Sequence, residues 1–423
     1  MSENAYYLGG GCLPLSAEED QARLVQRLRQ YVELRNLTLL IGNGCSLPLG
    51  SPRIDKVANL LPEIDTAPYR LADEQRQTRA RTLLDRLVPD KSALGVEPLL
   101  TILTNIQANE QLLHKVATFE GITASAADAQ CLEQLLKKWL FHRCKMLSAT
   151  SDESLRFHEE LLRRILLRST NLPRAKVFTV NYDLLLERAL DNLGVFYFDG
   201  FLGTINRTLR AESYHYDLYY PGETTEGRVS RVDRVLHLYK LHGSINWRRR
   251  PTAAADVIVS HATPDEDEYG DVMIYPSPLK VTEMNGYPYS EMFRHFSAHI
   301  HQPQSVLLTI GYRFQDGHIN RLIYQALSIP SFVLIIVTPQ LASPNAAESI
   351  GSSHEIWRLN EIGSKRILVI TGGEKDGTGN YTQGAGTLQE FSTKWLPDIT
   401  ELNTEASARE EVRKAFPPAP PPT

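Results

Sequence analysis

The sequence predicts an α/β protein built around a doubly wound parallel sheet. Short apolar runs rich in Val, Ile and Leu recur along the chain, and they are continuous rather than alternating, which is typical of strands buried on both faces. Stretches with apolar residues at helical spacing separate several of these runs, and such alternation favours helices on both faces of a parallel sheet. The predicted strands are Leu37–Gly42, Lys176–Asn181, Val235–Leu241, Ser305–Gly311, Phe332–Thr338 and Arg366–Thr371.

The helices predicted around these strands follow from the spacing of their apolar residues. Glu18–Leu34 forms an amphipathic pattern that leads into the first strand. Asp183–Leu193 follows the second strand, Asp316–Leu327 follows the fourth, and Leu388–Leu396 lies beyond the sixth. Each places apolar residues on one side, as a helix packed against a sheet requires.

A long interval separates the first two strands, from about Leu60 to Pro173, and a simple crossover does not need that length. We therefore expect a helical insertion that forms its own layer over the sheet. Its helix-like stretches are Leu71–Val88, Glu97–Gln107, Ala126–Leu147 and Glu153–Leu167. The expected domains are a core of residues 1–60 and 170–400, a helical insertion of residues 61–169, and a C-terminal tail of residues 401–423 with a proline-rich end.

Two smaller insertions interrupt the second half of the chain. Gly194–Arg234 is rich in Tyr, Gly and Arg and is expected to be irregular or to form a β-hairpin. Arg248–His301 contains an acidic loop at Asp265–Asp271, followed by a segment rich in Tyr and Pro.

Composition and charge exclude several classes of protein. The chain has 423 residues, a hydrophobic share of 42% and a formal net charge of -5, so no global field draws it to nucleic acid or to an anionic membrane. The clusters at Trp247–Arg250 and Arg228–Arg234 leave a local nucleic-acid contact open as a weaker alternative. The run Phe332–Val337 is far too short to span a membrane, and the first residues show no secretory signal. We expect a cytoplasmic protein.

The four cysteines, at positions 12, 45, 131 and 144, contain no CxxC pair. Neither a structural zinc site nor a disulfide framework is therefore expected, and no metal is assigned.

Glycine-rich turns follow the first and the fourth predicted strands. Gly42-Asn43-Gly44-Cys45-Ser46 comes directly after an apolar strand, where glycines let the backbone approach a pyrophosphate. The third glycine of a complete GxGxxG is missing, because Leu47 takes its place. Gly311 ends the fourth strand, and Asp316 follows as a helix cap or a ligand contact.

Polar side chains follow the second and third predicted strands. Asn181 and Asp183 lie at the end of one, and His242 ends the other ahead of Gly243. In open α/β sheets the ligand crevice lies beyond the carboxyl ends of the strands, so these side chains are expected to meet there. Asp183 also fits a helix cap. The imidazole of His242 can accept a proton near neutral pH.

These four segments, in this order, resemble the sirtuin-like NAD-binding family. His242-Gly243-Ser244 looks like the catalytic histidine motif of that family, and Thr179–Asp183 looks like its Asn/Asp segment. Gly311, with Phe314, Asp316, Ile319 and Asn320, is similar to the version found in bacterial anti-phage sirtuin-like proteins. The resemblance implies a Rossmann-like core that binds NAD.

Two departures from that family point away from protein deacylation. The chain lacks the two CxxC pairs of the deacylase zinc module, and Thr338-Pro339-Gln340 stands where an acidic NAD-binding segment is expected. The resemblance therefore implies an NAD⁺ hydrolase that depletes NAD in bacterial antiviral defence. It further implies a homo-oligomer and a HerA-type hexameric ATPase as partner, with the activity gated by that partner or by assembly.

The implied reaction cleaves the bond between nicotinamide and ribose through an oxocarbenium-like state. Asn181 orients a ribose hydroxyl or the attacking water, and His242 is the base. The residues assigned to NAD binding are Gly42, Asn43, Gly44, Ser46, Asp183, Gly311 and Asp316. A deacylase or ADP-ribosyltransferase, and a non-catalytic NAD or ADP-ribose sensor, stay as alternatives. The residues do not distinguish NAD from NADP.

Overall fold

The computed structural model describes residues 2–54, 63–89, 94–113, 117–119, 122–147, 150–220, 231–252, 256–264, 273, 286–341, 352–377 and 379–398. Its centre is a single large sheet, and the strands matching all six predicted runs lie in it as parallel neighbours. The predicted doubly wound α/β class is therefore confirmed. The sheet order is β2 (Gly11–Pro14), β1 (Ser2–Leu8), β15 (Ile367–Lys375), β14 (Val333–Thr338), β13 (Ser305–Ile310), β3 (Asn36–Ile41), β6 (Lys176–Thr179), β10 (Val235–Lys240) and β7 (Phe196–Phe198).

The direction in which the chain adds strands reverses next to β3. From β3 the chain builds outward through β6 to β10, and it then returns to place β13 on the other side of β3. From there it continues to β14 and β15. A crevice opens beyond the carboxyl ends of the strands at such a reversal, so the loops after β3 and β13 are where a ligand is expected.

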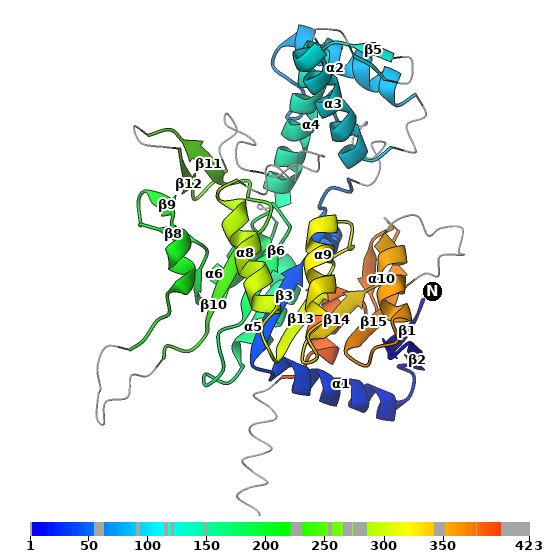
Figure 1. The fold of residues 1–423 in the computed structure, drawn as a ribbon, viewed down its shortest axis with the longest axis vertical. Helices are drawn as coiled ribbons and strands as arrows, with labels where there is room; N and C mark the ends of the chain where they lie inside the picture. Colours follow the sequence, from blue (N-terminus) through cyan, green and yellow to red (C-terminus); the bar gives the residue numbers. More distant parts are fainter. Residues whose placement is uncertain are drawn as a thin grey trace, which may run out of the picture.

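Helices cover both faces of this sheet (Figure 1). One face carries α1 (Glu18–Val32), α5 (Arg156–Leu166), α6 (Leu185–Asn192) and the π-helical turn η6 (Phe391–Trp395). The other carries α8 (Tyr289–Ile300), α9 (Gly317–Ala326) and α10 (Ser352–Glu361). All residues of β10, β13 and β14 are buried, which explains why their sequences are continuously apolar instead of alternating.

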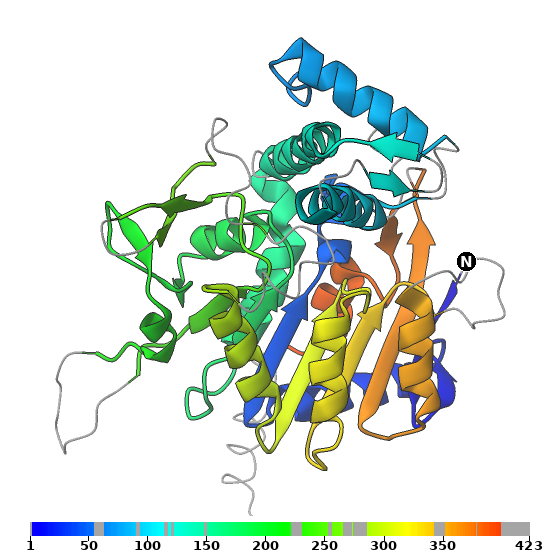
Figure 2. The same ribbon diagram turned by 45° about the horizontal axis from the view of Figure 1, so that its top comes forward.

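A helical layer lies over the carboxyl ends of the strands, most clearly in Figure 2. It consists of α2 (Glu74–Leu87), α3 (Val96–Leu113), α4 (Ala126–Leu147) and the hairpin of β4 (Ala117–Phe119) and β5 (Ile122–Ala124). This layer has its own buried cluster, which Leu184 and Ile245 join from the loops after β6 and β10. Helix α5 packs with the sheet instead, so we propose that the insertion ends before α5.

Several elements had no clear signal in the sequence. They include the β1–β2 hairpin at one edge of the sheet and α8, which falls inside the Arg248–His301 insertion. The hairpin expected within Gly194–Arg234 is present as β8 (Phe201–Leu202) and β9 (Arg207–Leu209). It joins β11 (Trp247–Arg250) and β12 (Val257–Ser260), which had no such signal, in a small antiparallel sheet, and β16 (Tyr381–Gln383) pairs with β15. The predicted helix Leu388–Leu396 is a short α11 (Leu388–Glu390) that runs into η6. The acidic loop Asp265–Asp271 and the tail 401–423 lie outside the described residues.

Candidate functional site

The glycine turns after β3 and β13 cross in direct backbone contact. Gly44 N donates a hydrogen bond of 2.9 Å to Gly311 O. A Cβ on Gly42 would lie 2.5 Å from Gly311 O, and one on Gly44 would lie 2.7 Å from Gly311 Cα. Gly311 itself has φ +64°, a conformation that side chains rarely adopt. The glycines are therefore needed first for the close approach of two loops, and this approach shapes the crevice.

The glycine turn after β3 fixes the side chain of Asn181. Its Nδ2 donates to Gly42 O at 3.3 Å and to Ser46 Oγ at 3.1 Å, and its backbone N–H donates to Thr179 Oγ1 at 3.0 Å. The side-chain oxygen Oδ1 is buried, and among the described residues it has no hydrogen-bond partner. Because a buried unpartnered carbonyl oxygen is costly, Oδ1 is suited to accept a hydrogen bond from a ligand.

Ser46 and Asp183 extend this network. Ser46 Oγ donates to Asp183 Oδ2 at 2.9 Å, and Asp183 Oδ1 accepts from the backbone N–H of Leu185 at 3.1 Å. Lys240 Nζ donates to the backbone oxygen of Asp183 and pairs with Glu187 Oε1 at 2.9 Å. Asp183 thus acts as a cap and a brace for the loop that carries Asn181.

His242 follows β10 and faces the carboxylate of Asp316. The distance from His242 Nε2 to Asp316 Oδ2 is 3.0 Å, and both side chains are less than a tenth exposed. Asp316 is also the N-cap of α9, where Oδ1 accepts from His318 N at 3.2 Å. A carboxylate beside Nε2 favours a proton on that nitrogen and orients the ring.

These side chains meet in a small cavity of about 160 Å³. Asn181 and His242 line it from the sheet side, while Glu97, Leu140 and Cys144 line it from the helical layer. Of the nine residues expected to form the site, those lining this cavity are Asn43, Gly44, Asn181, Asp183, His242, Gly311 and Asp316. Gly42 and Ser46 lie directly behind them through the contacts described above.

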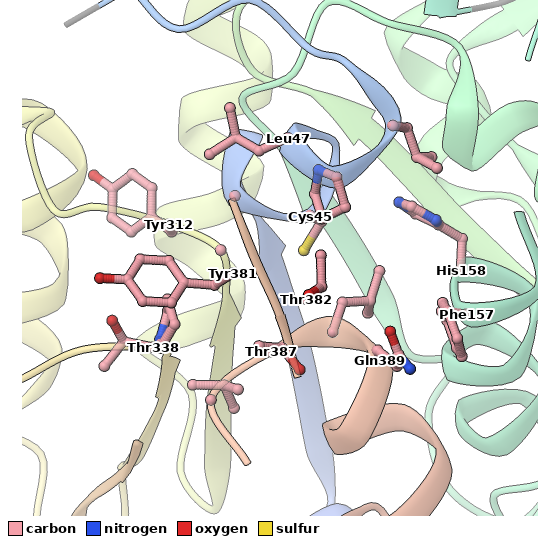
Figure 3. Close-up of a pocket in the computed structure, with 18 of the residues that line it drawn as sticks. Cys45, Leu47, Phe157, His158, Tyr312, Thr338, Tyr381, Thr382, Thr387 and Gln389 are labelled. Atoms are coloured by element: carbon pink, nitrogen blue, oxygen red, sulfur yellow. The ribbon is translucent and has the colours of Figure 1, made fainter. Parts of the chain in front are cut away.

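A larger cavity of about 620 Å³ opens on the other side of the glycine turns. The two cavities share Gly44, Leu47, Arg53, Gly311, Tyr312 and Arg313, so they are adjacent along the crevice. Figure 3 shows Thr338, Tyr381, Thr387 and His158 around this larger cavity, from elements far apart in the sequence.

Sequence reasoning found Gly44, Gly311 and the segment Thr338-Pro339-Gln340 of the large cavity but missed Tyr381, Thr387 and His158. Tyr381 and Thr387 belong to no recognisable motif, and the only signal for them was their position after β15. His158 is buried, and among the described residues its Nδ1 has no hydrogen-bond partner. Burial lowers the pKa of His158 to about 4, so its ring is neutral at physiological pH.

Cys45 lies within the glycine turn but does not suit nucleophilic chemistry. Burial raises the pKa of its thiol, and the nearby Asp183 raises it further. Its Sγ is 3.4 Å from Ile310 O, to which the thiol donates. Because the thiolate is the reactive form, this cysteine is a packed structural residue.

Within the described ranges, no group of three or more His, Cys, Asp or Glu side chains is placed to hold a metal ion. No helix in those ranges is both long and apolar enough to cross a membrane.

Fold and site together define a doubly wound α/β protein with a two-part crevice at its topological switch point. A family model described as a SIR2-like domain matches residues 175–352, a range that contains Asn181, His242 and Gly311 but not the first glycine turn. Curated proteins gave no match.

Solved structures of Sir2 homologues are similar at low identity. A Sir2 homologue in complex with ADP-ribose has 14% identity and a TM-score of 0.36, covering 80% of this chain and 95% of its own. A Sir2 homologue in complex with NAD has 13% identity and a TM-score of 0.34, covering 80% and 93%.

Proposed function

We propose that this protein is an NAD⁺ glycohydrolase, which cleaves the bond between nicotinamide and ribose. The observation that carries the proposal is the small cavity, where the imidazole of His242 lies beside Asn181 Oδ1, an atom with no hydrogen-bond partner in the described part of the chain. The match of residues 175–352 to a SIR2-like domain supports NAD as the ligand. The nicotinamide ribose would occupy the small cavity, and the ADP part would extend across the glycine turns into the large one.

The roles of the site residues follow from their contacts. Asn181 Oδ1 accepts a hydrogen bond from a ribose hydroxyl or from the attacking water, while Gly42 and Ser46 fix its amide. His242, oriented by Asp316, takes the proton of the water as its oxygen bonds to the anomeric carbon. The bonding pair leaves with nicotinamide, which departs as a neutral molecule. The products are nicotinamide, ADP-ribose and one proton.

We further propose, from the sequence resemblance alone, that the enzyme acts as an NAD-depleting effector in bacterial antiviral defence. Loss of NAD harms the host cell, so the activity would be gated by self-assembly or by a partner such as a HerA-type ATPase. The helical layer that covers the small cavity is a suitable place for such control.

The decisive experiment measures nicotinamide and ADP-ribose released from NAD by the purified full chain, with and without cell extract and without any peptide. We expect release by the wild type and a loss of about 100-fold or more for Asn181→Ala and His242→Ala, the range typical of a missing acid–base group. His261→Ala is the control, because this exposed histidine lines neither cavity.

Release at the wild-type rate by either site variant would contradict the role of that residue. Release that requires an acylated peptide would replace hydrolysis with deacylation. Binding of ADP-ribose without any turnover of NAD would favour a sensor.

A further inference from the structure

In the part of the large cavity beyond β14, two hydroxyl groups donate their hydrogens to Gln340 and hold it in place. Thr338 Oγ1 donates to Gln340 O at 3.1 Å, and the hydroxyl of Tyr381 donates to Gln340 Oε1 at 2.6 Å. Because its oxygen is engaged by Tyr381, Gln340 has its amide NH₂ left to offer to a ligand. Tyr381 and Thr338 lie on the same side of this cavity in Figure 3.

A lysine lies beside Tyr381. Lys375 pairs with Tyr381 across the β15–β16 ladder, and its Nζ lies 5.3 Å from the centre of the Tyr381 ring. Its neighbours Glu374 and Asp376 do not line the cavity. Among the described residues that line this cavity, the positively charged ones are Arg53, Arg156, Arg313 and Lys375, and the carboxylate is Glu153.

This chemistry suits an anion better than an unmodified ribose. In doubly wound dinucleotide sites, a carboxylate accepts hydrogen bonds from the 2′-hydroxyl of the adenosine ribose, whereas a cation accommodates a 2′-phosphate. Here the strand end offers Thr338-Pro339-Gln340 with no acidic side chain, and Lys375 follows from the neighbouring strand.

We infer that this side of the large cavity binds a phosphate on the adenosine ribose, so that NADP is bound in preference to NAD. The inference rests on the proposed placement of the dinucleotide across the two cavities. Gln340 donates to the phosphate through its NH₂, and Lys375 contributes the neutralising charge. Arg313 lines the shared wall of the two cavities, which the diphosphate would cross.

The test is equilibrium binding of two non-cleavable ligands, ADP-ribose and ADP-ribose 2′-phosphate, to the intact protein by calorimetry. Neither ligand contains nicotinamide, so the result does not depend on turnover. We expect the phosphorylated ligand to bind at least tenfold more tightly, since charge-assisted hydrogen bonds are the strong ones. Tighter binding of ADP-ribose would overturn the inference without contradicting the proposed hydrolase activity. If neither ligand bound, the proposed nucleotide site would be wrong as well.

Two substitutions locate the effect. Gln340→Glu keeps the length of the side chain and an acceptor for Tyr381, and it should reverse the preference by favouring ADP-ribose. Lys375→Glu should weaken binding of the phosphorylated ligand about tenfold and change ADP-ribose binding less than threefold. Lys365→Glu is the matched control, because this residue precedes β15 at the opposite end of the strand and should change neither affinity. An unchanged ratio in both Gln340→Glu and Lys375→Glu would overturn the inference.

Discussion

At the scale of single residues, the backbone around Gly311 leaves no room for a side chain. A Cβ at this position would lie 2.6 Å from Cys45 N and 2.9 Å from the carbonyl carbon of Gly44, both of them backbone atoms that cannot simply rotate away. The positive φ adds conformational strain for any residue other than glycine. Gly317 differs from it, because a Cβ there would meet no atom within 4 Å.

We therefore predict that Gly311→Ala separates the two glycine turns. Unfolding free energy should fall by roughly 1–3 kcal/mol, the usual range for strain at such a position. Binding of ADP-ribose should weaken by at least tenfold, because the displaced turns form the shared wall of both cavities. Denaturant unfolding and calorimetric titration check this. Gly317→Ala serves as the control, and identical behaviour of the two variants would refute the argument.

At the scale of elements, β6, β10 and α8 bring together a lysine and three histidines whose pKa values are lowered by burial. His237 Nδ1 is 2.9 Å from Lys176 Nζ, and His237 Nε2 is 3.0 Å from Tyr216 O. Burial, reinforced by Lys176, lowers the pKa of His237 to about 3, and burial lowers the pKa of Lys176 to about 7. On α8, burial lowers the pKa values of His295 and His299 to about 4 and about 3.

This cluster predicts a loss of stability in mild acid. Between about pH 6.5 and pH 4 the unfolded chain binds protons on these histidines while the folded chain does not, so stability falls as pH falls. The contribution of the neutral histidines to stability is fully present above pH 6.5. At pH 5, His237 alone accounts for a loss of up to about 2 kcal/mol of unfolding free energy. Denaturant unfolding at pH 7.5 and pH 5 measures it.

Comparing the wild type with His237→Gln shows how much of the pH dependence of stability comes from His237. Glutamine can accept from Lys176 and donate to Tyr216 O, as the histidine does, but it does not titrate in this range. The pH dependence of the variant should be smaller than that of the wild type. An equal dependence in both proteins would show that His237 takes up a proton in the folded state.

At the scale of the whole molecule, the small cavity joins the sheet to the helical layer. Glu97 from α3, together with Leu140 and Cys144 from α4, lines the space that Asn181 and His242 line from below. Leu184 and Ile245 also connect the buried cluster of this layer to the loops of the site. A ligand in the small cavity therefore contacts both units.

We predict that a bound dinucleotide stabilises the helical layer as well as the sheet loops. At a ligand concentration of about 100 times Kd, the folded state should gain about 2.7 kcal/mol. Hydrogen exchange, measured with NAD on the His242→Ala protein, should slow in α3 and α4 as well as in the glycine turns. Protection of the turns with unchanged exchange in α3 and α4 would show that the layer does not close on the ligand. Helix α1, which lines neither cavity, gives the remote reference.

The sequence by itself determined the six central strands of the sheet and the sheet-side residues of the small cavity. Continuous apolar runs such as Ser305–Gly311 identify strands covered on both faces, because burial on both sides removes the need for alternation. The polar residues after those strands, Asn181 and His242, were expected to meet, since parallel strands end at the same edge of a sheet. Their roles in catalysis stay a prediction.

Only the tertiary structure decided which side chains complete the site. The approach of His242 to Asp316, the large cavity around Tyr381 and the packing of α5 with the sheet all join segments distant along the chain. Such contacts leave no periodic signal, because they depend on the order in which strands are placed in the sheet. Helix α8 was missed for a related reason: its sequence follows an irregular insertion, and its helical form is stabilised by packing against β3 and β13.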